Sequence, residues 1–127
     1  MKNGQIFYAK THADFLNTAF GTHYKAWMKC VWKYNSNMVV WMVRFNKNDG
    51  GWRNTFISNN QIMEENIGKV KIWDGKPVEW LDKTRIVVEI IDQGVNRRYI
   101  FKGVYEYNAE KSNPSTVRYY DKIADEI

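Results

Sequence analysis

The chain has 127 residues, of which 44% are apolar and 16% aromatic, with two Pro and one Cys. This composition predicts a single folded domain over residues 1–127; it excludes a disordered chain, a disulfide framework and a cysteine metal cage. The net charge of +5 is uneven, because residues 1–60 carry eight Lys or Arg against two Asp, whereas residues 61–127 carry eleven against twelve Asp or Glu. A positive field attracts polyanions, among which nucleic acid is the commonest partner.

The apolar runs are too short for a signal peptide or a membrane span. The longest uncharged apolar run is Met38–Val43, far below the length that crosses a bilayer. Together with the single thiol, this predicts a cytoplasmic location.

The first third of the chain predicts one strand, one helix and one hairpin. Residues 5–9 form a short strand, and Thr11 is placed as the N-cap of an amphipathic helix that Gly21 ends. Residues 27–34 and 38–45 each alternate with a period of two around a polar turn, which predicts a hairpin that carries aromatic and cationic side chains.

The rest of the chain predicts a second helix and several short strands. Residues 46–51 are loop-like and residues 52–57 strand-like, and Ser58 followed by Gln61 is a capping box that predicts a helix ending at Gly68. The later elements are strands at 69–73, 78–81, 85–91, 97–107 and 116–120, with a tight turn at Asp74-Gly75. In the longest of these strands, Tyr99, Phe101, Tyr105 and Tyr107 are expected on one face around Gly103. The fold class predicted from this order is α+β, with a small bent antiparallel sheet or barrel and two short flanking helices.

The C-terminal quarter resembles a known family. Residues 98–123, RYIFKGVYEYNAEKSNPSTVRYYDKI, contain an aromatic-x-Gly-x-Tyr strand at Phe101–Tyr105 and a basic residue beside aromatics at Val117–Tyr120. Both features resemble the closing strands of PUA-like modules, in particular the SRA-like domains that read modified bases and accompany modification-dependent restriction enzymes. The resemblance implies a curved PUA-like barrel in which a flipped base lies between aromatic rings and is hydrogen-bonded at its edge.

The strongest local candidate for a binding site is Gly50-Gly51-Trp52-Arg53-Asn54. A glycine-rich loop followed by a ring, a guanidinium and an amide offers base stacking, a phosphate contact and a reader of base edges. Trp41, among valines, is expected in the core. The residues predicted to bind nucleic acid are Lys25, Trp27, Lys29, Arg44, Trp52, Arg53, Asn54, Arg98, Tyr105, Arg118 and Tyr119.

The predicted function is a nucleic-acid-binding module, for DNA in preference to RNA, that reads a modified or flipped base within a restriction or defence system. No catalytic residue, metal or cofactor is expected, so the chain is predicted to bind and not to catalyse. Two alternatives stay open. One is a small phage-type inhibitor or adaptor that binds a protein through exposed aromatics, and the other is a ribonuclease toxin. Asp74-Gly75-Lys76 with Asp49, Glu64 or Glu65 also has the spacing of a metal-dependent nuclease, but the segment Trp73–Pro77 is first of all a turn sequence, which disfavours this nuclease alternative.

Overall fold

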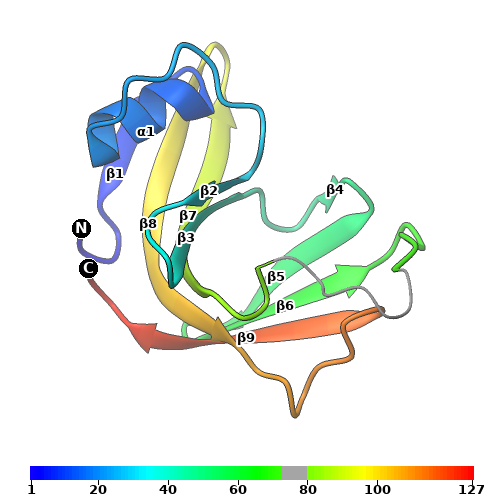
Figure 1. The fold of residues 1–127 in the computed structure, drawn as a ribbon. Helices are drawn as coiled ribbons and strands as arrows, with labels where there is room; N and C mark the ends of the chain where they lie inside the picture. Colours follow the sequence, from blue (N-terminus) through cyan, green and yellow to red (C-terminus); the bar gives the residue numbers. More distant parts are fainter. Residues whose placement is uncertain (73–79) are drawn as a thin grey trace.

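The computed structural model in Figure 1 describes residues 1–72 and 80–127. Within these residues the chain forms one helix, α1 (His12–Phe20), and nine strands. The strands are β1 (Ile6–Ala9), β2 (Val31–Lys33), β3 (Met38–Val43), β4 (Asn48–Asp49), β5 (Trp52–Ser58), β6 (Gln61–Asn66), β7 (Thr84–Gln93), β8 (Asn96–Tyr107) and β9 (Val117–Ala124). No helix in this part of the chain is long and apolar enough to cross a membrane.

All nine strands belong to one curled sheet. Its order is β2-β3-β7-β8-β9-β6-β5-β4, with β1 beside β8. In Figure 1 the long strand β8 bends, so that β3 and β7 stand steeply whereas β5, β6 and β9 lie across the bottom of the view. Neighbouring strands are antiparallel except for β3 and β7, which are parallel. A parallel pair needs a long crossover, and here residues 44–83 make that connection and form β4, β5 and β6 on the way.

Helix α1 forms where the sequence predicts it. The Thr11 hydroxyl oxygen accepts a hydrogen bond from the backbone N–H of Asp14 at 3.1 Å, and Gly21 ends the helix in the left-handed conformation. Phe15 and Leu16 are fully buried, and the Phe15 ring stacks on Tyr99 with 4.5 Å between ring centres. The helix therefore covers one face of the sheet, at β8.

Strand β3 is buried on both faces. Val40 and Met42 belong to the core under α1, whereas Trp41 and Val43 belong to a second core on the inner side of the curl, together with Tyr120. A strand buried on both sides needs apolar residues at every position. This explains why Met38–Val43 is an unbroken apolar run.

The predicted α+β class with two helices is wrong, because the protein is mostly β and the residues of the predicted second helix form the turn after β5 and then strand β6. The Ser58 hydroxyl accepts from the backbone N–H of Asn60 at 3.1 Å, so it closes a tight turn instead of capping a helix. After this turn, Ile62 and Glu64 face inward on β6, which pairs with β5 on one side and β9 on the other. Two partner strands outweigh a local capping signal that also fits a turn.

The predicted common face of the aromatic residues in β8 is also wrong, because a β-bulge interrupts the strand. Val88 pairs with Phe101 and Val87 with Gly103, so one extra residue lies in β8 between these pairs. An extra residue moves the following side chains to the opposite face. Phe101 accordingly packs under α1, whereas Tyr105 packs in the inner core.

Two other predicted strands are shorter than expected or absent. Residues 27–30 are irregular, so the first hairpin keeps only Val31–Lys33 as β2, and residues 69–72 form no strand. The predicted turn at Asp74-Gly75 and residues 78–79 of the predicted strand at 78–81 lie outside the described residues, and residues 80–81 form a turn.

Candidate nucleic-acid interface

A cavity of about 240 Å³ opens on the inner side of the curled sheet. We call it the inner cavity. Strands β3, β5 and β6, the β4 turn and the segment before β2 supply its walls. Its lining residues are Cys30, Trp41, Met42, Val43, Asp49, Gly50, Trp52, Asn54 and Glu64. It combines ring surfaces with carboxylate and amide groups, as a site for a nucleobase requires.

A larger hollow of about 570 Å³ near the chain termini is a weaker candidate for a base. Its ring residues are Phe56 and Tyr105. Phe56 is already stacked on Phe45 at 4.0 Å, with the Lys102 ammonium 5.2 Å from its ring centre, and Tyr105 is fully buried. Neither ring therefore offers an open face for stacking.

Two glycines fix the position of Trp52 at the inner cavity. Gly50 and Gly51 form the two-residue turn between Asp49 and Trp52, and both have positive φ, as this type of hairpin turn requires. A Cβ atom on Gly51 would lie 2.5 Å from Val70, and the Gly51 carbonyl accepts from the backbone N–H of Gly68 at 2.8 Å. The turn is thus packed closely against the segment that follows β6.

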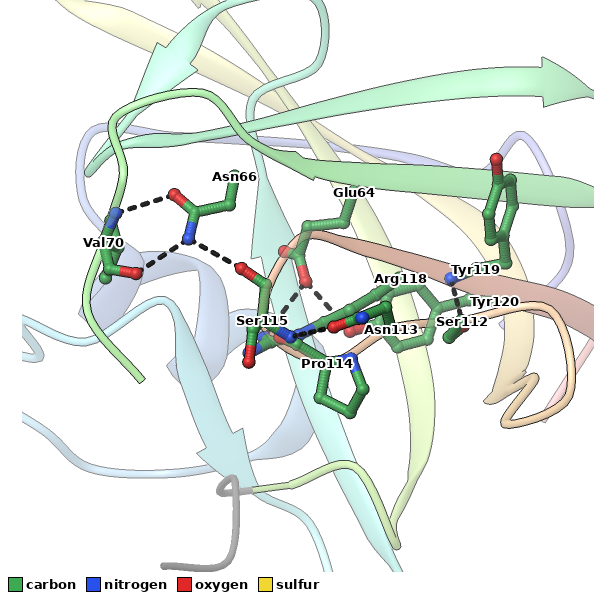
Figure 2. Close-up of polar contacts among 10 residues, drawn as sticks. All are labelled: Glu64, Asn66, Val70, Ser112, Asn113, Pro114, Ser115, Arg118, Tyr119 and Tyr120. Carbon is green, nitrogen blue, oxygen red and sulfur yellow. Dashed lines mark hydrogen bonds and ion pairs between the residues drawn. The ribbon is translucent and has the colours of Figure 1, made fainter. Parts of the chain in front are cut away.

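The same segment is tied to the loop before β9. The Asn66 side-chain amide donates to the carbonyl oxygens of Val70 at 2.8 Å and Ser115 at 2.9 Å, and its oxygen accepts from the Val70 N–H at 2.7 Å. Figure 2 shows these contacts beside Glu64 and Arg118. One partly buried amide therefore joins the end of β6, the Gly68 segment and the β8–β9 loop.

Glu64 is a buried carboxylate with one oxygen held by the protein. Its Oε1 accepts from the Tyr120 hydroxyl at 2.9 Å and lies 3.4 Å from Nη1 of Arg118 (Figure 2). Burial raises the pKa of Tyr120, so its phenol stays protonated and remains a donor. The other oxygen of Glu64 has no partner among residues 1–72 and 80–127, so it is an acceptor available to a bound group.

Arg118 connects Glu64 to Trp52. Its guanidinium lies 4.1 Å from the centre of the Trp52 ring, and its Nε donates to the Pro114 carbonyl at 2.8 Å. One face of the ring is therefore covered by a cation, and the ring also lines the inner cavity. A second arginine, Arg85, lies 4.6 Å from the ring centre of Trp41.

Asn54 and Cys30 add polar groups to the wall. Asn54 is 5% exposed, and its side-chain oxygen has no partner in the described part of the chain. Turning the amide by half a rotation exchanges its oxygen and nitrogen, so Asn54 can present either an acceptor or a donor. Desolvation and the charge of Asp49 raise the pKa of the Cys30 thiol, which keeps it protonated and a poor nucleophile.

The structure brings together only part of the predicted set. Trp52 and Asn54 line the inner cavity and Arg118 supports it, whereas Trp27 and Arg44 line a neighbouring cavity. Tyr105 is fully buried, and the Tyr119 ring is covered by the Lys111 ammonium at 4.4 Å. The other predicted residues are Lys25, Lys29 and Arg53, which are exposed, and Arg98, which is partly buried on β8.

The residues predicted to bind nucleic acid do not include Asp49 and Glu64, the acidic residues of the inner cavity. The sequence suggests these two residues only as possible metal ligands. No group of three His, Cys, Asp or Glu residues that could hold a metal occurs within the described ranges. Asp74, on which the nuclease alternative depends, lies outside them.

Comparison with known proteins identifies a family and a similar solved structure. The family model of the SRA domain, described as the SET and RING associated domain, matches residues 5–127. No curated protein matches the chain. The fold is similar to a solved structure of the 5-hydroxymethylcytosine-specific restriction enzyme AbaSI, with a TM-score of 0.67 and 21% sequence identity. That match covers 94% of this chain and 39% of the enzyme's chain, so this chain spans about two fifths of that length.

Proposed function

Because the chain belongs to the SRA domain family, we propose that its inner cavity receives a modified cytosine flipped out of DNA. Membership confirms the prediction of an SRA-like domain and of a nucleic-acid-binding module that reads modified bases. The choice of cytosine, the preference for DNA over RNA and the residues that contact the base belong to the proposal.

The observation that carries this proposal is the acceptor-rich wall of the inner cavity. Glu64 offers a carboxylate oxygen, Asp49 a second carboxylate, and Asn54 an amide that can present its oxygen. Cytosine carries an amino group that donates to such acceptors, whereas thymine and uracil present a carbonyl at the same position. The structural relative, an enzyme specific for 5-hydroxymethylcytosine, supports the same choice.

Trp52 is the proposed stacking partner. Its ring is partly exposed at the cavity and carries Arg118 on one face. Stacking of a base on an aromatic ring contributes about 1–3 kcal/mol, which offsets the few kcal/mol required to unstack and unpair a nucleotide. Exposed cations on the same half of the chain, among them Lys25, Lys29 and Arg53, would contact phosphates.

We propose that residues 1–127 act as one recognition unit in the cytoplasm. The similarity covers only part of the restriction enzyme, so any DNA cleavage in such a system is assigned to a different domain or protein. This assignment agrees with the expectation that the chain binds and does not catalyse.

The test is a titration with duplexes that differ at one position only. Tryptophan fluorescence would follow binding of DNA containing cytosine, 5-methylcytosine, 5-hydroxymethylcytosine or thymine, and of an RNA duplex with the same sequence. We expect the tightest binding for one modified cytosine. Equal affinity for all the duplexes would contradict base reading, and equal affinity for the RNA would contradict the preference for DNA.

A matched pair of variants tests the role of Glu64. Glu64→Gln keeps the shape of the side chain but removes its charge, and should lower the affinity for the preferred duplex by about 1–3 kcal/mol. Glu65→Gln changes the neighbouring residue, whose side chain points to the opposite face of β6, and should bind normally. A Glu64→Gln protein that melts like the parent and binds as tightly would remove Glu64 from base recognition.

A further inference from the structure

A second cavity, of about 270 Å³, lies next to the inner cavity at the start of α1. We call it the arginine cavity. Its lining residues are Thr11, His12, Trp27, Met28, Arg44 and Arg97. Base recognition as proposed above uses none of them.

A directed chain of hydrogen bonds sets the state of His12. Arg97 Nη1 donates to the Tyr99 hydroxyl oxygen at 3.2 Å, and the same hydroxyl lies 2.8 Å from Nδ1 of His12. Arginine only donates, so the hydroxyl oxygen accepts from Arg97 and its own proton is available to Nδ1. This arrangement favours the tautomer of the neutral imidazole with its proton on Nε2, which has no partner among the described residues. Burial, together with Arg97 and Arg44, lowers the pKa of His12 to about 4, which keeps the ring neutral.

Two guanidinium groups share one carboxylate beside this cavity. Arg44 donates to Asp92 through Nε at 2.7 Å and Nη2 at 3.1 Å, and Arg97 Nε lies 3.4 Å from the same carboxylate. One negative charge therefore faces two positive charges. Lys47 lies close enough to lower the pKa of Asp92 as well, and Asp49 is the other carboxylate that acts on His12. The walls present mainly hydrogen-bond donors and a residual positive charge.

From this arrangement we propose that the arginine cavity binds a phosphate of the DNA backbone next to the flipped nucleotide. A phosphodiester is an acceptor-only anion, and the guanidinium N–H groups that Asp92 does not engage can donate to it. Asp49 lines the inner cavity and also acts electrostatically on His12 in the arginine cavity, and Met28 is two residues from Cys30, so the two cavities lie near each other. Two residues span at most about 7 Å, and the proposal therefore places the phosphate within one or two nucleotides of the base. This inference depends on the proposed function for the position of the base.

The first test changes the DNA and keeps the natural protein. In a duplex with the preferred base, each phosphate near that base is replaced in turn by a neutral methylphosphonate. We expect one replacement, within two nucleotides of the modified base, to weaken binding by about tenfold or more. If the cavity binds a free phosphate ion and not the DNA backbone, no replacement will weaken DNA binding, and the proposal fails. Equal small effects at every position would overturn the proposal.

The second test combines this DNA with a protein variant. Arg97→Gln should weaken binding of the unmodified backbone about tenfold and lower the salt slope by about one. Arg97→Gln and the natural protein should bind the methylphosphonate duplex with equal affinity, because the contact between Arg97 and the phosphate is already absent from that duplex. Lys2→Gln, an exposed cation near the termini, should change neither value.

The outcomes separate the two proposals. Phosphate contacts carry no sequence information, so Arg97→Gln should keep the ratio of affinities for modified and plain DNA. If the natural protein binds modified and plain DNA with the same affinity, the proposed function fails. If the natural protein discriminates but the phosphate replacements and Arg97→Gln have no effect, only the phosphate site fails. The methylphosphonate series decides the question even if Arg97→Gln does not fold.

Discussion

The guanidinium of Arg118 lies 4.1 Å from the centre of the Trp52 ring, and one of its nitrogens lies 3.4 Å from the Glu64 carboxylate. A single side chain from β9 thus holds both the proposed stacking ring and the proposed reader of the base edge. Both charged side chains are only 9% exposed, so the pair is part of the core as well as of the site.

Replacing Arg118 by Met should destabilise the domain. Methionine keeps the apolar part of the side chain but leaves the Glu64 carboxylate buried without its cation. We expect the free energy of unfolding to fall by about 3–5 kcal/mol. Urea unfolding measures it. Adding Glu64→Gln to Arg118→Met should restore part of the loss, because the unpaired charge is then absent; equal stability of the single and double variants would contradict this explanation.

Replacing Trp52 by Ala should weaken DNA binding without unfolding the protein. Loss of the stacking surface should cost about 1–3 kcal/mol of binding free energy, measured by titration with the preferred duplex. Trp52→Phe keeps a ring and should lose less. A Trp52→Ala protein that binds normally, or that melts at a much lower temperature, would remove Trp52 from the site.

Gly103→Ala should destabilise the domain more than Gly94→Ala. Both glycines have positive φ, but a Cβ atom on Gly103 would lie 3.0 Å from the Ala124 carbonyl oxygen, whereas Gly94 has nothing within 4 Å. We expect about 1 kcal/mol for Gly94 from backbone strain alone and about 2–3 kcal/mol for Gly103, where contact adds to strain. Thermal unfolding of the two variants compares them directly, and similar losses would show that packing at the bulge is unimportant.

His12 should make stability depend on pH between about 4 and 6.5. Its pKa is lowered from 6.5 to about 4 in the folded protein, so between these values the unfolded chain binds a proton that the folded chain does not. This contribution is complete above pH 6.5 and is lost as the pH falls toward 4. Relative to His12→Gln, the natural protein should lose about 1–3 kcal/mol more between pH 7 and 4.5. Parallel pH profiles would contradict the buried neutral imidazole.

The elements that the sequence predicts correctly are those with local signals. Thr11 and Gly21 mark both ends of α1, and the capping contacts lie within three or four residues of each other. Ser58 carries a similar local signal but lies in a turn, because β6 pairs with its neighbour β5 and with β9, where Gln61 lies opposite Asp121. The pairing with the distant strand β9 cannot be recognised from a capping pattern.

The same limit explains the site. One short motif predicts Trp52 and Asn54 as site residues, whereas the helix predicted after Ser58 gives no reason to place Glu64 at the site. In a strand over residues 61–66, Ile62 and Glu64 share one face, and a carboxylate on the same face as a core isoleucine indicates a functional residue. The sequence predicts that Tyr105 stacks on a base, but the bulge at Gly103 turns it into the inner core.

The parallel pairing of β3 with β7 also has a kinetic consequence. Trp41 lies on β3, which pairs with β7 only when the connection of about forty residues between these two strands has closed into a loop. Trp52 lies within that connection, on β5. Contacts between distant parts of a chain form late and slowly, because a large loop must close first. The inner cavity should therefore be among the last features to appear during refolding, so that recovery of DNA binding lags behind formation of α1.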